Sequence, residues 1–150
     1  MISMKILLLE DDEDDYILTR SLLGRIPGDF VLDWAPRYDD AVRLLSNGSY
    51  DVCLVDCRLG DRDGLELLHS PLVEQLPIIV LTGQDDPGVA IRAMKFGAAD
   101  YLVKGEFNAS MLERSMRYSI ERKRIRDELV RARDGLDRLV LERTAELQLA

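Results

Sequence analysis

Apolar residues follow two alternating periods along most of this chain. Short, mostly apolar runs occupy residues 5–9, 30–35, 52–55, 77–81 and 100–103, and each ends in charged residues or turn formers. Such runs are typical of buried strands in a parallel sheet. Between them, apolar positions follow helical spacing in residues 16–23, 38–45, 65–68 and 90–94. Strands and helices therefore alternate, which predicts an α/β fold with a doubly wound parallel sheet.

The helical pattern that begins at Asn108 continues to the end of the chain. Forty residues of helix extend roughly 60 Å. Apolar side chains recur there with alternating spacings of four and three, at Ile125, Leu129, Ala132, Leu136 and Leu139. That spacing predicts a coiled-coil seam.

We therefore expect two parts, a core of residues 1–107 and an extended helical arm of residues 108–150. From the seam we expect two copies of the arm to associate along residues 111–140 as a parallel homodimer. The alternative is a single amphipathic helix that folds back on the core.

Polar residues follow the predicted strands at the points where the strands end. Asp11 and Asp12 follow the first strand, Asp56 the third, Thr82 the fourth and Lys104 the fifth. Parallel strands bring such positions to one edge of a sheet. Three carboxylates, a hydroxyl and an ammonium group at that edge predict a site for a divalent cation and a phosphoryl group. The alternative for Asp56 alone is a turn or helix-cap aspartate.

The charge distribution narrows the range of ligands. The chain has a net charge of −8, and residues 1–107 carry ten basic and twenty acidic side chains. A core this acidic argues against nucleic acid, because phosphate neutralisation needs Lys and Arg. It suits a cation or a basic partner. The run of acids at residues 10–15 includes Asp14 and Asp15, one of which is expected to cap the first helix.

The sequence also disfavours a zinc site and a membrane-spanning protein. Cys53, Cys57 and the lone His69 do not form a zinc pattern, and we expect reduced, buried cysteines. No apolar run has the length of about 18 residues that a membrane span needs. The first apolar run is too short for a signal peptide, so we expect a cytoplasmic protein.

The residues at the strand ends resemble those of the receiver domain of two-component response regulators. The resemblance covers Lys5 to about Arg117 and rests on an acid pair, a lone Asp, a Thr and a Lys at strand ends in this order. It implies a flavodoxin-like, five-stranded parallel sheet with the strand order 2-1-3-4-5. It also implies a signalling phosphoacceptor rather than an enzyme, with only self-catalysed phosphotransfer and autodephosphorylation.

The same resemblance implies roles for individual residues. Asp56 would accept a phosphoryl group from a phosphohistidine of a sensor histidine kinase or phosphotransfer protein. Mg²⁺ would be held by Asp12 directly, by Asp11 through water, by Asp56 and by the backbone carbonyl of Arg58. This cation suits such a site because it binds through few carboxylates and phosphate oxygens.

Three more residues complete the implied machinery. Thr82 would donate its hydroxyl to a phosphoryl oxygen, Lys104 would pair with the phosphoryl charge, and Tyr101 would be an aromatic switch that turns inward when Thr82 moves. Arg58 and Gln84 occupy positions that tune phosphoryl lifetime. Gly105 stands where the family usually has proline after the lysine, and we expect a trans peptide there.

Two alternatives and the output stay open at this point. Haloacid-dehalogenase-like phosphohydrolases also use an Asp nucleophile, Mg²⁺, Thr and Lys, but they carry D-x-D at the first strand, whereas Asp61-Arg62-Asp63 is expected in a loop. A scaffold that is never phosphorylated is the other alternative. The last residues resemble linkers upstream of kinase, sensor or cyclase domains, so an output domain of one of these types is expected beyond residue 150.

Overall fold

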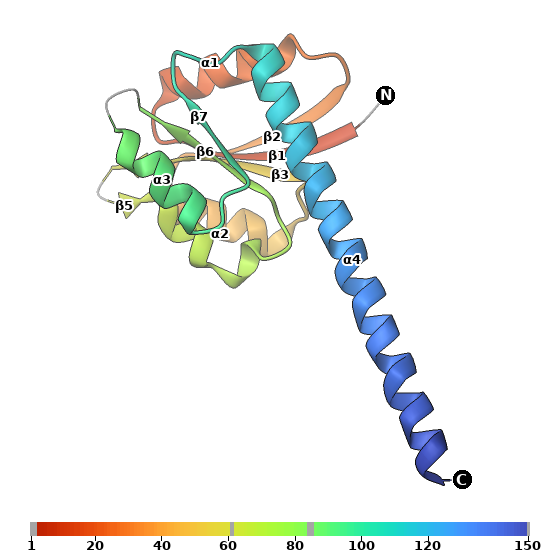
Figure 1. Ribbon diagram of the computed structural model, residues 1–150. Helices are drawn as coiled ribbons and strands as arrows, with labels where there is room; N and C mark the ends of the chain where they lie inside the picture. Colours follow the sequence, from red (N-terminus) through yellow and green to blue (C-terminus); the bar gives the residue numbers. More distant parts are fainter. Residues whose placement is uncertain (1–2, 61, 84–85, 150) are drawn as a thin grey trace. The chain divides into compact units, whose positions relative to one another are not determined.

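The computed structural model describes residues 3–60, 62–83 and 86–149. It contains two units, one that ends at Ile120 and one that begins at Glu121. The first unit holds the sheet, and the second consists of the continuation of the last helix (Figure 1).

The main sheet of the described residues has five parallel strands in the spatial order β2-β1-β3-β6-β7. The strands are β1 (Ser3–Leu9), β2 (Asp29–Ala35), β3 (Val52–Asp56), β6 (Ile78–Thr82) and β7 (Asp100–Val103). Numbered in chain order among themselves, they follow 2-1-3-4-5. The predicted flavodoxin-like fold is therefore confirmed.

Helices cover both faces of this sheet (Figure 1). They are α1 (Glu13–Gly24), α2 (Tyr38–Asn47), α3 (Pro87–Lys95) and α4 (Ala109–Leu149), with the 3₁₀ segments η1 (Gly64–His69) and η2 (Pro71–Val73). The start of α4 is capped as its sequence suggests, because Oδ1 of Asn108 accepts a hydrogen bond of 2.9 Å from the backbone N–H of Met111.

Two apolar layers hold the sheet between its helices. Ile6 and Leu8 of β1 pack in one layer with Leu112 of α4, whereas Leu7 and Leu9 belong to the other layer, which includes residues of α2 and α3. This alternation follows from the two-residue period of a strand. Each fully buried aliphatic side chain contributes about 1.5–3 kcal/mol. The strand ends that carry the polar residues are thus fixed by a continuous core.

Two features of the fold differ from the sequence expectation. The loop after β3 contains a short antiparallel hairpin, β4 (Arg58–Leu59) with β5 (Arg62–Asp63). The segment expected to be an α-helix from Gly64 is instead 3₁₀. The segment has only six residues before Ser70-Pro71, and short helical segments often adopt the tighter 3₁₀ turn.

The unit from Glu121 onward is an uninterrupted α-helix with exposed apolar side chains. Leu129, Leu136 and Leu139 are each more than 60% exposed. The neighbouring charges pair along the helix, as in the contacts of Arg124 with Glu121 and Glu128. None of the described helices combines the length and apolar character required to cross a membrane.

Candidate phosphoryl-transfer site

Asp56 is the last residue of β3, a strand whose residues are all buried. Its own exposed fraction is 5%, and its Oδ1 accepts a hydrogen bond of 3.2 Å from the backbone N–H of Arg58. The chain can turn at this point because Gly64 passes directly over the strand end. A Cβ atom on Gly64 would lie 2.0 Å from the carbonyl oxygen of Asp56, which leaves no space for a side chain.

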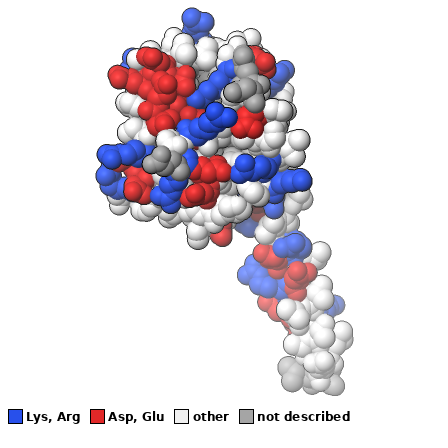
Figure 2. All heavy atoms as spheres, turned by 90° about the vertical axis from the view of Figure 1, so that its left-hand side faces the viewer, with Lys and Arg blue, Asp and Glu red and all other residues white. Residues whose placement is uncertain are grey.

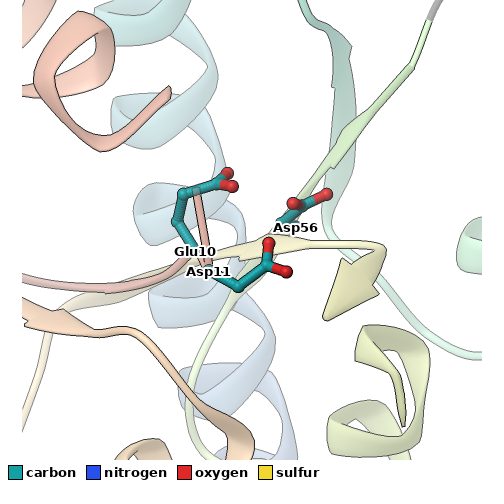
Figure 3. Close-up of side chains that lie close together, drawn as sticks. All are labelled: Glu10, Asp11 and Asp56. Carbon is teal, nitrogen blue, oxygen red and sulfur yellow. The ribbon is translucent and has the colours of Figure 1, made fainter. Parts of the chain in front are cut away.

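Three carboxylates meet at this edge of the sheet. Glu10 and Asp11 follow β1, and each offers an oxygen that lies within 4.8 Å of one from the other and one from Asp56. Figure 3 shows the three side chains converging from the ends of two neighbouring strands. Glu10 is completely buried, whereas Asp11 is exposed. On the face that bears these strand ends, acidic side chains gather next to basic ones (Figure 2).

Glu10 has an unusual electrostatic environment. Burial and, after it, the proximity of Asp56 raise the pKa of the Glu10 carboxyl from 4.5 to about 8. One of its oxygens, Oε1, accepts a hydrogen bond of 3.2 Å from the backbone N–H of Asp12. The other, Oε2, has no hydrogen bond, although Nζ of Lys104 lies 3.1 Å away. Lys104 is thus the charged partner of this buried oxygen, which accepts no hydrogen bond.

Asp12 does not join this cluster. It is the N-cap of α1, and its Oδ1 accepts hydrogen bonds from the backbone N–H groups of Asp14 (2.8 Å) and Asp15 (3.2 Å). The expectation that Asp14 or Asp15 caps the helix is therefore wrong. The acid pair that the structure brings to Asp56 is Glu10 and Asp11, one position earlier than the pair expected from the sequence.

Lys104 contacts three carboxylates at once. Its Nζ lies 2.8 Å from Asp15, 3.1 Å from Glu10 and 3.1 Å from Asp56. Burial disfavours the charged ammonium group, but the ion pairs with Asp15, Asp56 and Glu10 outweigh it and raise the pKa of Lys104. Lys104 therefore stays protonated and partly neutralises the acids around Asp56.

Thr82 and Tyr101 line a common cavity. Thr82 is buried at the end of β6, and its carbonyl oxygen accepts a hydrogen bond of 2.7 Å from the backbone N–H of Lys104. Tyr101 is 41% exposed. Both border a cavity of about 720 Å³ between β7 and α3, with Ala90, Ile91 and Met94 on the helix side. The predicted switch residues are thus brought together, with Tyr101 in an outward position.

The β4–β5 hairpin closes one side of the site. The backbone N–H of Gly60 at its turn donates a hydrogen bond of 3.0 Å to Oδ2 of Asp11. The guanidinium of Arg58 contacts Asp86 at 3.2 Å. Gln84, the other position expected to tune phosphoryl lifetime, lies outside the described residues.

The residues present suit a magnesium ion. Mg²⁺ takes oxygen ligands and binds through one or two carboxylates together with phosphate oxygens and waters. Three carboxyl groups in reach of one another, one of them with a buried oxygen that accepts no hydrogen bond, meet that requirement. The two cysteines are free and buried in the core, so they offer no ligand at the surface.

Sequence reasoning missed Glu10 as a site residue. The signal was present, because Leu9 ends the apolar run and Glu10 is the first carboxylate beyond it. Six consecutive acids carry no internal pattern that separates ligands from a helix cap. The two roles become distinct only where β1 ends and α1 begins.

Comparison with known proteins identifies clear relatives. Residues 6–116 match the family described as the response regulator receiver domain. The swarming motility regulation protein RssB of Serratia marcescens is 38% identical over 104 residues, which are 67% of this chain and 46% of that protein. A probable cyclic di-GMP phosphodiesterase of Vibrio cholerae is 30% identical over 111 residues, which are 71% of this chain and 25% of that protein.

Solved structures give a similar result. The crystal structure of a response regulator receiver domain protein from Clostridium thermocellum has a TM-score of 0.70 and 27% sequence identity, and the match covers 81% of this chain and 98% of that chain. The present chain spans less than half the length of the two curated relatives above.

Proposed function

This chain belongs to the receiver domain family of two-component response regulators, whose members are signalling phosphoacceptors, and on that premise we propose that Asp56 accepts a phosphoryl group. The observation that carries the proposal is a buried carboxylate at the end of β3 whose oxygen lies 3.1 Å from Nζ of Lys104. The donor is a phosphohistidine of a sensor histidine kinase or phosphotransfer protein. A carboxylate oxygen of Asp56 bonds to phosphorus as the phosphorus–nitrogen bond breaks, and the electron pair leaves with the imidazole nitrogen.

Glu10, Asp11 and Asp56 are the side chains that would hold Mg²⁺, together with the backbone carbonyl of Arg58. The buried Oε2 of Glu10, which accepts no hydrogen bond and contacts the Lys104 ammonium group, supports its membership of this set, and Asp12 is left to cap α1. A bound Mg²⁺ supplies positive charge that offsets the repulsion between the Asp56 carboxylate and an anionic phosphoryl group.

Lys104 and Thr82 are the groups that stabilise the product. The Lys104 ammonium group already contacts Asp56, so it can pair with the charge of a phosphoryl group attached there. The Thr82 hydroxyl lies on the adjacent strand, one residue beyond the partner of Asp56 in the sheet register, and would donate to a phosphoryl oxygen.

Tyr101 is the residue that would report the reaction to the surface. It shares a cavity with Thr82, and that cavity has room for an aromatic side chain. A shift of Thr82 towards a phosphoryl group would open the inward position for the Tyr101 ring and change the surface formed by α3 and β7.

Labelling with a small phosphodonor tests the assignment of Asp56. Acetyl phosphate with Mg²⁺ should phosphorylate the wild type and should not phosphorylate Asp56→Asn, as read by intact mass. Asp63→Asn is a matched control, because Asp63 lies in the neighbouring hairpin, and it should be labelled like the wild type. Equal labelling of Asp56→Asn would contradict the proposal. Steady turnover of a generic phosphate ester would instead favour the phosphohydrolase alternative.

We also propose that two copies of the chain associate in parallel through the arm. Ile125, Leu129, Leu136 and Leu139 present an exposed apolar stripe at coiled-coil spacing, and an isolated helix cannot bury it. Val140 and Leu147 fall off this seam, so its register is less regular after Gly135.

Light scattering on two chain lengths tests this association. The full chain should be a dimer, and a chain cut after Ile120 should be a monomer, because the cut removes the stripe and leaves the globular unit whole. A monomeric full chain, or a cut chain that dimerises equally well, would refute the role of the arm. An output domain after the arm remains part of the proposal, since the match covers only 46% and 25% of the two curated relatives named above.

A further inference from the structure

We propose that Trp34 is a positioning residue for the acid pair, because its indole N–H fixes the peptide bond that joins Glu10 to Asp11. Nε1 of Trp34 donates a hydrogen bond of 2.7 Å to the backbone carbonyl oxygen of Glu10. The inference rests on the proposed function, since it concerns the carboxylates assigned to Mg²⁺.

The indole is itself held in one orientation. Its ring stacks on Tyr16 of α1 with the centroids 4.1 Å apart and the planes within 5°. The guanidinium of Arg20 in turn lies 5.5 Å from the centroid of the Tyr16 ring. A half-buried aromatic ring fixed in this way presents its single N–H donor in one direction.

That hydrogen bond controls more than one backbone angle. A peptide unit is planar, so fixing the direction of the Glu10 carbonyl restrains ψ of Glu10 and φ of Asp11 together. A second bond supports it from the same strand, since the backbone N–H of Glu10 donates to the carbonyl of Ala35 at 3.0 Å. Both sides of Glu10 are thus attached to β2 beyond the last paired residue of β1.

The restraint matters because the acid pair has to present two side chains to the same point. Glu10 and Asp11 each bring a carboxyl oxygen close to one of Asp56, and rotation of the peptide bond between them would turn one of the two side chains away. Because the peptide is already held, cation binding loses no free energy in ordering it. Loss of the hydrogen bond from Trp34 should weaken Mg²⁺ binding about three- to tenfold. This range corresponds to the net contribution of one hydrogen bond.

The sequence offers a sharp test, because Trp34 is the single tryptophan of the chain. Biosynthetic replacement of tryptophan therefore changes this position only. β-(3-Benzothienyl)alanine keeps the ring shape and the stacking but has sulfur in place of N–H, whereas 5-fluorotryptophan keeps the donor. Calorimetric titration with Mg²⁺ alone should show a three- to tenfold higher dissociation constant for the benzothienyl protein and wild-type affinity for the fluorotryptophan protein.

Two more readouts separate positioning from general stability. The amide ¹⁵N resonance of Asp11, which belongs to the same peptide unit as the Glu10 carbonyl, should shift in the benzothienyl protein without Mg²⁺. Labelling by acetyl phosphate should need more Mg²⁺ to reach half of its maximal rate, and the rate at saturating Mg²⁺ should equal that of the wild type. Tyr16→Phe, which preserves the stacked ring, is a matched control and should leave the affinity unchanged.

The possible outcomes are distinct. Unchanged Mg²⁺ affinity in the benzothienyl protein, with normal binding by the wild type and loss of binding in Asp11→Asn, would overturn the role of Trp34 and leave the proposed function intact. Wild-type protein that binds no Mg²⁺ would overturn both.

Discussion

A buried carboxyl group defines the site at the scale of single residues. Glu10 is inaccessible to solvent, lies beside Asp56 and contacts Lys104. Such a group is costly to ionise unless a cation is near. Its protonation therefore links the stability of the fold to pH and to cation binding.

The stability of the metal-free protein should fall as pH rises. The pKa of Glu10 is raised from 4.5 to about 8 by burial and by Asp56, so between these values the native state holds a proton that the unfolded chain releases. Stability from this group is complete below pH 4.5 and is lost through pH 8, by an amount on the order of a few kcal/mol. Urea unfolding in EDTA across this window should show the decline in the wild type and a flatter profile in Glu10→Gln. Parallel profiles would contradict the raised pKa.

Gly64 should be intolerant of any side chain. A Cβ atom there would lie 2.0 Å from the Asp56 carbonyl oxygen, so Gly64→Ala must displace the end of β3. We expect a loss of about 2–4 kcal/mol in unfolding free energy, within the range of severe steric substitutions. Gly24→Ala is the control, because no atom lies within 4 Å of its added Cβ in α1. Thermal unfolding should show a large drop for the first variant and little change or a small gain for the second.

At this scale the sequence misassigned the acid pair by one position. Asp56 and Lys104 meet as expected, because each follows a recognisable strand and parallel strands align their ends. Thr82 and Tyr101 likewise lie where their strands place them. Glu10 was not distinguished from Asp12 because charge alone does not show where a strand ends within a run of acids.

At the scale of elements, apolar periodicity predicts the regular strands and helices but not the short segments that are determined by tertiary contacts. The five strands and the helices of the main fold follow from apolar spacing. The β4–β5 hairpin has two residues in each strand, too few for a period, and it is attached through the hydrogen bond from Gly60 to Asp11. The 3₁₀ form of η1 depends on its short length between Gly64 and Ser70.

The turn between β7 and α4 should reject the residue that the family usually has there. Gly105 has a φ of 82°, in the left-handed region, whereas proline is restricted to about −65°. Gly105→Pro should therefore destabilise the protein by at least about 1 kcal/mol, since this backbone is incompatible with the ring. Gly105→Asn should cost less, because asparagine enters the left-handed region more readily than other residues. Equal unfolding temperatures for Gly105→Pro and the wild type would show that the turn adapts.

At the scale of the whole molecule, one helix belongs to two units. The first turns of α4 are part of the globular core, with Leu112 and Met116 completely buried. From Glu121 onward the same helix exposes apolar side chains such as Leu129 and Leu136. The boundary lies within α4, whereas the sequence-based division at residue 107 was placed where this helix was expected to begin.

The burial of both native cysteines has a practical consequence for chemical cross-linking. Cys53 is inaccessible and Cys57 nearly so, and burial raises the pKa of both thiols. Thiolate is the reactive form, so a cysteine introduced in the arm would be the one that reacts.

In a parallel, in-register pair, equivalent seam residues face each other closely enough for a disulfide. Mild oxidation should therefore join two copies of Leu129→Cys into a covalent dimer and leave Arg131→Cys, on the outer side of the helix, as single chains. An antiparallel pair would leave Leu129→Cys uncoupled, so one gel without reductant reads the direction of the two chains.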